Sequence, residues 1–171
     1  MVMFEDCRVP AENLIGEEGQ GFRIAMAGLD GGRLNISACS IGGAQFCLDR
    51  TLQYMRERKQ FGTRLADFQA LAFRIADYAT DLEAARLMVR HAASAVTKRE
   101  PGGTRLAAMA KKFATDVGFE AVNGCLQLHG GYGYLRDHPI ERVLRDVRVH
   151  QILEGTNEVM RLIVSRSLLG N

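Results

Sequence analysis

The fold is decided by the stretch DFQALAFRIADYATDL, residues 67–82. Its large apolar side chains recur at every third or fourth position: Phe68, Leu71, Ile75, Tyr78 and Leu82. This spacing places them on one face of an α-helix. We expect the helix to begin at Asp67, whose carboxylate can cap the first turn, and to end near Arg99, before the helix-breaking Pro101-Gly102-Gly103.

Helical patterns also precede this stretch. Residues from about Gly19 to Arg58 are compatible with a helix, although Gly28, Gly31 and Gly32 each weaken it by up to about 1 kcal/mol relative to alanine. Four apolar positions share one face of it: Ile41, Leu48, Leu52 and Met55. A turn at Phe61-Gly62-Thr63 separates this helix from the next.

Further helices follow the break at Pro101. Thr104 can cap a third helix that runs to about His129. Its apolar stripe consists of Leu106, Met109, Phe113, Val117, Ala121 and Cys125. Shorter helices are expected near residues 140–147 and from about Thr156 to Leu169. Because no alternating strand pattern of useful length occurs, the sequence predicts an all-α protein, an antiparallel up-down helical bundle.

Length and composition limit the class of protein. The 171 residues suffice for one domain with a sizeable core, and 47% hydrophobic with 25% charged residues excludes a disordered chain. A net charge of +2 predicts no nucleic-acid-binding surface. No apolar run approaches the roughly 20 residues that span a membrane, and the N-terminus MVMFED lacks the pattern of a signal peptide.

Metal chemistry is not expected. The cysteines form no C-x-x-C pair and show no metal-ligand spacing, so we interpret all four as small buried apolar residues: Cys7, Cys39, Cys47 and Cys125. The four histidines are equally scattered, and the Glu-x-x-His pattern of a di-iron bundle is absent from the sequence.

Two features in the first half of the chain could bind a ligand. The glycines of Leu29-Asp30-Gly31-Gly32-Arg33 permit the close approach of a ligand or, equally, of another helix. The basic cluster Arg56-Glu57-Arg58-Lys59 closes a helix, where cations stabilise the helix dipole by about 0.3–1 kcal/mol. Arginine also binds phosphate through its forked guanidinium. Both features therefore have a structural and a functional interpretation.

Two more features lie in the second half. The glycines in residues 127–133, QLHGGYG, either cap a helix or let the backbone approach a pyrophosphate, although they are not a G-x-G-x-x-G motif and follow no strand. Glu154 follows the apolar pair Ile152-Leu153. A carboxylate among apolar neighbours can act as a general base. The alternative is an ordinary acidic residue that stabilises the start of a helix.

Taken together and in order, these motifs resemble the C-terminal domain of the flavin-dependent acyl-CoA dehydrogenases over nearly the whole chain. The matching stretches are VPAENLIG (9–16), DGGR (30–33), ERKQFG (57–62), QLHGGYGY (127–134) and ILEGT (152–156). Within that family, GRLNI (32–36) and VHQILEG (149–155) look most like the isobutyryl-CoA dehydrogenases.

The resemblance implies FAD-dependent α,β-dehydrogenation of a short or branched acyl-CoA thioester. The family's catalytic base falls on Glu154, which would remove the α-proton while a hydride leaves the β-carbon for the flavin. Family members with the base on the earlier helix carry glutamate where this chain has Gly32, so Gly32 and Glu154 together indicate the commoner arrangement. The backbone N–H of Glu154 would hydrogen-bond the thioester carbonyl, where charge develops.

The resemblance also implies binding roles for the matching residues. On the FAD side these are Arg58, Phe61, Gln69, Gln127, Gly130, Gly131, Thr156 and Glu158. On the substrate side they are Asp30, Gly31, Gly32, Arg33, Gly155 and Arg166. Because the FAD contacts come from two chains, the resemblance implies a homodimer or homotetramer, and it implies the electron-transfer flavoprotein as electron acceptor.

Complete members of the family carry a helical domain and a β-domain ahead of this segment. We therefore expect residues 1–18 to lead in from the missing middle domain, residues 19–171 to form the bundle, and the chain to be a fragment or one part of a split enzyme. Alone it should bind FAD weakly and show little turnover. The family implies a bacterial cytoplasmic or mitochondrial matrix protein. A non-catalytic oligomerisation and FAD-binding module, a helical adaptor without cofactor and an acyl-CoA oxidase stay open as alternatives.

Overall fold

The computed structural model describes residues 2–170, so Met1 of the expected lead-in segment and Asn171 of the expected bundle lie outside the described residues. Its elements, in chain order, are η1 (Ala11–Asn13), α1 (Gly21–Glu57), β1 (Lys59–Gln60), β2 (Thr63–Arg64), η2 (Leu65–Asp67), α2 (Gln69–Thr97), α3 (Gly103–His129), η3 (Gly130–Tyr134), α4 (Ile140–His150) and α5 (Asn157–Leu169).

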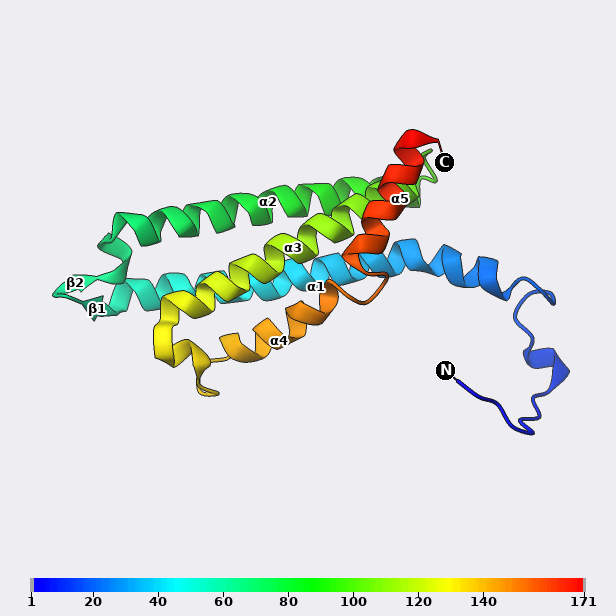
Figure 1. Cartoon of the computed structure of the whole chain (residues 1–171), viewed down its shortest axis with the longest axis horizontal. Coiled ribbons are helices and arrows are strands. Elements are labelled where there is room, and N and C mark those ends of the chain that lie inside the picture. Colours follow the sequence, from blue (N-terminus) through cyan, green and yellow to red (C-terminus); the bar gives the residue numbers. More distant parts are fainter. Residues whose placement is uncertain (1, 171) are drawn as a thin grey trace.

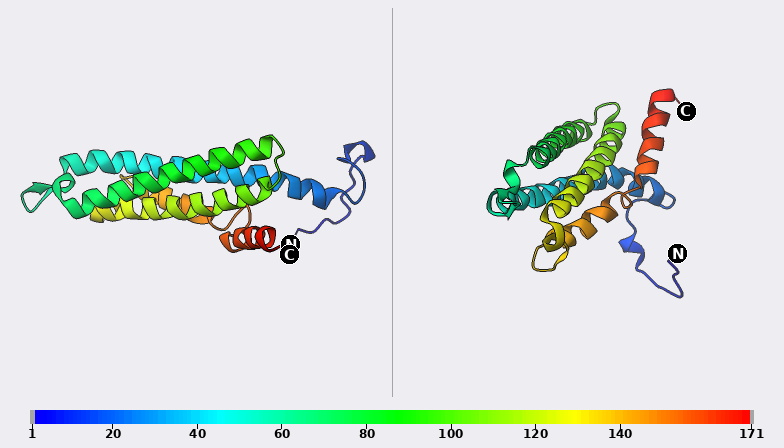
Figure 2. Two further views of the ribbon diagram at one scale, coloured as in Figure 1. Left: turned by 90° about the horizontal axis from the view of Figure 1, so that it is seen from above. Right: turned by 60° about the vertical axis from the view of Figure 1, so that its left-hand side comes forward.

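The helices α1 to α4 alternate in direction, and α5 crosses one end of the bundle (Figure 1). Two further views, one from above and one turned by 60° about the vertical axis, show the same bundle (Figure 2). Helix α3 contacts each of the other four helices, and the main core lies between it, α1, α2 and α4. The predicted all-α antiparallel bundle is therefore confirmed.

The central place of α3 explains why its burial differs from the predicted stripe. Of that stripe, Ala121 and Cys125 are buried, but Leu106, Phe113 and Val117 are only partly covered and Met109 is 37% exposed. Half of the buried residues of α3 are instead small ones: Ala107, Ala108, Ala110, Ala114, Gly118, Ala121 and Gly124. Small side chains let the neighbouring helices approach α3 from several sides at once.

Both predicted helix caps are wrong. Asp67 lies in η2, ahead of α2, and its carboxylate accepts two hydrogen bonds from Arg64, at 2.9 and 3.0 Å. Thr104 lies inside α3, because Gly102, with a left-handed φ of 86°, turns the chain directly into the helix. The hydroxyl of Thr104 donates instead to Asp30 Oδ2 on α1, at 2.6 Å.

The expected turn at Phe61-Gly62 is the tip of a small hairpin. Lys59 pairs with Arg64 and Gln60 with Thr63, so each strand has only two residues. Phe61 and Gly62 both have left-handed φ angles, 53° and 78°, as a tight two-residue hairpin requires. Strands this short carry no alternating pattern that the sequence could reveal.

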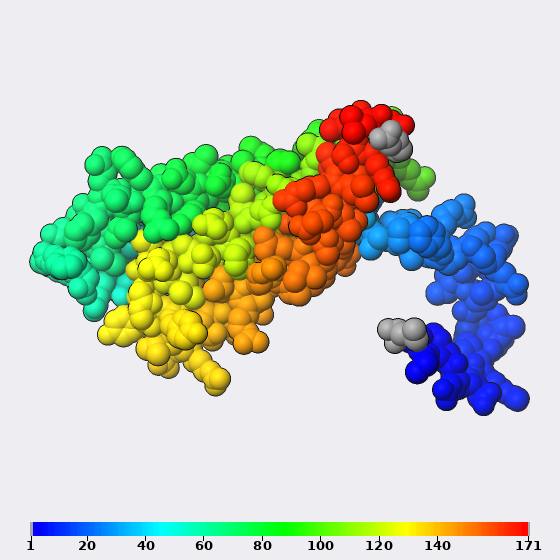
Figure 3. All heavy atoms as spheres, viewed as in Figure 1, coloured from blue at the N-terminus to red at the C-terminus, as the bar shows by residue number. Residues whose placement is uncertain are grey.

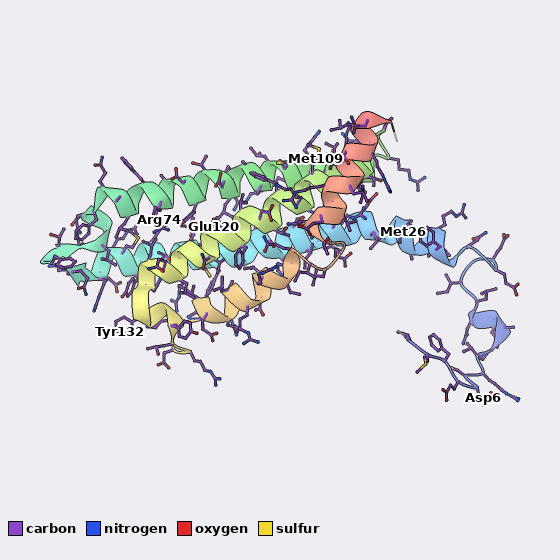
Figure 4. The ribbon with its side chains drawn as sticks, viewed as in Figure 1. Asp6, Met26, Arg74, Met109, Glu120 and Tyr132 are labelled. Atoms are coloured by element: carbon purple, nitrogen blue, oxygen red, sulfur yellow. The ribbon has the colours of Figure 1, made fainter. Side chains whose placement is uncertain are left out.

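The N-terminal part of the chain lies outside the bundle. Residues 2–19 are exposed, and the first turns of α1 project beyond the other helices (Figure 3). Met26 lies on this projecting part and Asp6 near the far end of the loop that leads to it (Figure 4). The outer position of this segment also explains one error of the sequence analysis, since Cys7 is exposed.

Only two of the four cysteines are buried as predicted. Cys47 and Cys125 lie in the main core, where burial raises the pKa of each thiol, to about 12 and about 11. Cys39 is exposed because it lies on the outer face of α1. Within residues 2–170 no group of histidine, cysteine and acidic side chains could hold a metal ion, and no described helix is long and apolar enough to cross a membrane.

Candidate active site

Glu154 lies in a tight loop, residues 151–156, that joins α4 to α5. Glu154 and Gly155 both adopt left-handed φ angles, 57° and 86°. The loop is closed by a hydrogen bond from Asn157 N to the carbonyl oxygen of Gln151, at 3.0 Å. A left-handed glutamate is uncommon and costs free energy, and such positions cluster at functional sites.

The loop places the Glu154 carboxylate directly against the backbone of α1 at Gly32. A Cβ atom added to Gly32 would lie 2.3 Å from Glu154 Oε2 and 2.7 Å from its carboxyl carbon. Any side chain at position 32 would therefore displace the carboxylate. The structure thus places in contact two residues that the resemblance already pairs.

Asp30 and Arg33 lie on the same part of α1. The Arg33 guanidinium, 6% exposed as a residue, donates from Nη1 to Asp30 Oδ1 at 2.7 Å. Its Nε atom is buried without a hydrogen-bond partner among the described residues. A buried N–H without a partner costs free energy, which a ligand's oxygen would recover. Gly31, beside them, has open space where a side chain would stand.

The sequence analysis missed a buried polar group beneath this loop. Lys111 Nζ donates to the carbonyl oxygen of Gly155 at 2.8 Å and to Asn157 Oδ1 at 2.9 Å. Burial is the main cause that lowers the pKa of Lys111 to about 8. Lys111 lies four residues after Ala107 and seven before Gly118, on the small-residue face of α3, where nothing in the sequence signals that a charge is buried.

A cavity of about 440 Å³ lies at the opposite end of the bundle. Among its lining residues are Arg58, Gln127, Gly130 and Gly131, four of the predicted FAD-side residues. A Cβ added to either glycine would meet no atom within 4 Å, so their backbone is open to a ligand. The Arg58 guanidinium lies over the Tyr132 ring, 5.3 Å from its centroid. A cation beside open glycine backbone suits a phosphate group.

Aromatic residues around this cavity were also missed. Tyr54, on α1, stacks on His129 with ring centroids 4.3 Å apart. Tyr132 follows the end of α3, where it is labelled in Figure 4. Burial lowers the pKa of His129, so its ring stays neutral at neutral pH and suits an apolar stack. His129 and Tyr132 lie within the quoted stretch QLHGGYGY, but the sequence gives no sign that Tyr54, 75 residues earlier, packs on it.

The remaining predicted site residues do not line the cavity with Arg58: Phe61, Gln69, Thr156, Glu158 and Arg166. Phe61 is 95% exposed at the hairpin tip, and Gln69 is the exposed first residue of α2. Thr156 caps α5 by accepting a hydrogen bond from Val159 N at 3.3 Å. Glu158 is exposed in the first turn of α5, where its own backbone N–H and the Thr156 hydroxyl lower its pKa. Arg166 is exposed in the last turn of α5.

The two places are far apart on one helix. Gly32 lies in the first half of α1 and Arg58 directly follows its end. At about 1.5 Å of rise per residue, roughly 39 Å of helix separates them. The two places therefore lie at opposite ends of α1 within one copy of the chain.

The chain is similar to known proteins over almost its whole length. Residues 19–169 match the acyl-CoA dehydrogenase C-terminal domain family. The chain is 56% identical over 167 residues to the mitochondrial isobutyryl-CoA dehydrogenase of Dictyostelium discoideum, covering 98% of this chain and 40% of the relative. It is 48% identical over 168 residues to CarC, the caffeyl-CoA reductase-Etf complex subunit of Acetobacterium woodii, covering 98% of this chain and 44% of that protein.

A solved structure shows the same fold. The butyryl-CoA dehydrogenase of Megasphaera elsdenii superposes with a TM-score of 0.93 at 43% identity, over 97% of this chain and 43% of that one. The chain thus spans about two fifths of the length of these relatives. By its sequence match and its fold, the chain belongs to the acyl-CoA dehydrogenase family and carries its C-terminal domain.

Proposed function

We propose that the chain is the catalytic C-terminal domain of an acyl-CoA dehydrogenase that acts on a short or branched thioester such as isobutyryl-CoA. The observation that carries this proposal is the Glu154 carboxylate, held by a left-handed loop against the bare backbone of Gly32. The family is FAD-dependent, and high identity to isobutyryl-CoA dehydrogenase supports the choice of substrate.

In this proposal Glu154 is the base. Its carboxylate removes the proton from the α-carbon of the thioester, and the electron pair of that C–H bond forms the new double bond. The backbone N–H of Glu154 donates to the thioester carbonyl oxygen, where negative charge develops. FAD, when bound, accepts the hydride that leaves the β-carbon.

Residues around Glu154 hold the substrate in this proposal. Arg33, whose buried Nε lacks a partner, and Asp30 face the thioester and pantetheine, and Gly31 and Gly32 leave room for them. Gly155 lies beside the acyl group, and Arg166 is a more distant substrate-side residue.

The FAD site is built from two copies of the chain. Thr156 and Glu158 contact the FAD of their own subunit, and the residues at the far end of the bundle contact the FAD of a partner: Arg58, Phe61, Gln69, Gln127, Gly130 and Gly131. The two places lie roughly 39 Å apart along α1, at opposite ends of one chain, which supports this division. The protein is therefore a homodimer or homotetramer.

The relatives also suggest the wider setting. CarC is named as a subunit of an Etf complex, which supports an electron-transfer flavoprotein as the partner that reoxidises the flavin. Relatives are named as mitochondrial or come from bacteria, which supports a mitochondrial matrix or bacterial cytoplasmic protein. Residues 1–18 lead in from a preceding domain, and residues 19–171 form the bundle.

The test needs the domains that precede this segment in its relatives. In a hybrid dehydrogenase, this chain replaces the corresponding segment of the isobutyryl-CoA dehydrogenase of D. discoideum. Glu154→Gln in the hybrid should abolish turnover of isobutyryl-CoA and leave the FAD content unchanged. Glu120→Gln, which changes an exposed glutamate of α3, is the matched control and should keep turnover. Turnover by the Glu154→Gln hybrid would overturn the proposal.

A further inference from the structure

Lys111 is a fully buried cation for which the proposed reaction has no direct use. The residue has 0% exposure, and its Nζ has two neutral acceptors, the Gly155 carbonyl oxygen and Asn157 Oδ1. Burying a cation is unfavourable unless it is well bonded, and neutral partners repay the cost only in part. A buried lysine here therefore calls for a reason beyond packing.

One of the two acceptors determines the shape of the Glu154 loop. The Gly155 carbonyl oxygen turns inward to reach Lys111 on α3. Glu154 and Gly155 both hold left-handed φ angles where this carbonyl meets Lys111. The Glu154 carboxylate, on the same loop, lies against Gly32. The hydrogen bond from Lys111 thus holds the conformation that aims the carboxylate.

The other acceptor anchors the end of the loop. The Asn157 side-chain amide donates to Thr115 Oγ1 at 2.9 Å and to Asp116 Oδ1 at 2.7 Å, both on α3. Gln151, at the start of the loop, donates to the same Asp116 oxygen at 2.8 Å. Both ends of the loop are therefore tied to one short stretch of α3 that includes Lys111.

Charged groups on four parts of the chain act on Lys111. Asp116 lies on its own helix, Arg33 on α1, Glu154 in the loop and Glu158 on α5. The three carboxylates attract the ammonium group and Arg33 repels it, but burial outweighs them and lowers the pKa of Lys111.

We propose that Lys111 is a positioning residue for the base: by bonding the Gly155 carbonyl and Asn157, it holds the loop that aims the Glu154 carboxylate at the substrate. This inference rests on the proposed function of Glu154. Lys111 touches neither substrate nor flavin in this account, so its effect falls on proton removal and not on binding.

The test compares two neighbouring lysines in the hybrid dehydrogenase defined above. Lys111→Met keeps the length of the side chain and removes its charge and donors. We expect kcat to fall about 100-fold, the loss typical of a small misplacement of a catalytic group, while KM and FAD content change less than about twofold. The isotope effect on kcat with α-deuterated isobutyryl-CoA should rise, because proton removal becomes slower. Lys112→Met, the same change at the next, partly exposed residue of α3, should leave kcat within about twofold.

The outcomes separate this inference from the proposed function. If Glu154→Gln stops turnover but Lys111→Met keeps kcat and the isotope effect of the wild type, Lys111 has no positioning role. A Glu154→Gln hybrid that still turns over would overturn the proposed function itself. If Lys111→Met fails to fold, Lys111→Gln decides: it keeps an N–H donor, and it should show a kcat below the wild type with the raised isotope effect. Wild-type kinetics in Lys111→Gln would overturn the inference.

Discussion

At the scale of single residues, the position of Glu154 depends on the missing side chain of Gly32. Glu154 reaches α1 only because residue 32 has no side chain. A glycine inside a helix is unfavourable, so Gly32 lowers the stability of α1 while it leaves space for the Glu154 carboxylate. Stability and activity should therefore respond in opposite directions to a change at this position.

Gly32→Ala tests this opposition. The new Cβ meets only the end of a flexible side chain, so the Glu154 carboxylate should move aside without unfolding the protein. We expect the free energy of unfolding of the chain to stay constant or rise by up to about 1 kcal/mol, and turnover of the hybrid to fall more than about tenfold. Chemical denaturation and steady-state kinetics measure the two effects. Gly28→Ala, on the same helix with open space around it, should stabilise without the loss of turnover. Full activity in Gly32→Ala would contradict the described position of Glu154.

Lys111 should give the stability of the chain a particular pH dependence. Its pKa is about 8 in the folded chain and about 10.5 when unfolded, so between these values the unfolded chain binds more protons. The free energy of unfolding contributed by Lys111 therefore rises with pH from about 8 to about 10.5 and is constant below. The free energy of unfolding is measured by denaturation at several pH values for the wild type and for Lys111→Met. The difference between the two proteins at each pH isolates the contribution of Lys111. A difference that stays flat across the window would show that the lysine is not buried as described.

At the scale of elements, periodicity predicted each long helix but not which of them lies in the middle. A stripe of large residues marks the face of a helix that covers a core, as in α2, whereas α3 is buried on several sides by alanine and glycine. Such small residues have weak hydropathy, so the pattern at Leu106, Met109 and Phe113 pointed to one side only. Lys111 was missed for the same reason, because a charge on a small-residue face reads as solvent-exposed until the partners of that face are known.

The close packing of α2 on α3 gives a prediction about stability. A Cβ added to Gly124 would lie 2.0 Å from Tyr78 Oη and 2.3 Å from Tyr78 Cζ, and Tyr78 is itself buried. Gly124→Ala should therefore destabilise the chain by about 1–3 kcal/mol, although alanine favours a helix. Gly42→Ala, at an open position of α1, should stabilise it by up to about 1 kcal/mol. Thermal or chemical denaturation checks both, and a stabilised Gly124→Ala would contradict the α2–α3 contact.

The motifs that carry chemistry were more predictable than the packing around them. Glu154 and Gly32 could be paired from the sequence by resemblance alone, and the structure places them in contact. The left-handed φ of Glu154 could not be predicted, because it depends on the bonds that tie the loop to α3. Asp67 and Thr104 failed as caps because a hairpin and a left-handed Gly102, both set by tertiary structure, start these helices.

At the scale of the whole molecule, the two candidate sites lie at opposite ends of the bundle, roughly 39 Å apart along α1. Glu154 lies at one end and the cavity with Arg58 and Gly131 at the other. If each FAD lies between two chains, a variant defective at one place and a variant defective at the other should restore one working site in a mixed dimer.

Complementation between two inactive variants tests the shared site. Gly131→Val fills the cavity from an open position, so it should fold but lose FAD binding, and Glu154→Gln should bind FAD without turnover. In a mixed dimer of the two hybrids, one site combines the intact Glu154 of the first chain with the intact Gly131 of the second. Co-expression should therefore restore turnover that neither variant shows alone. A co-expressed pair that folds, associates and stays inactive would show that each chain builds its site alone.

The central claim, that Glu154 removes the α-proton, is tested most directly by a single turnover. The wild-type and Glu154→Gln hybrids, both loaded with FAD, are mixed rapidly with isobutyryl-CoA while the visible flavin absorption is followed. The account predicts rapid bleaching in the wild type and no bleaching in Glu154→Gln on the same timescale. Bleaching of Glu154→Gln at the rate of the wild type would contradict it.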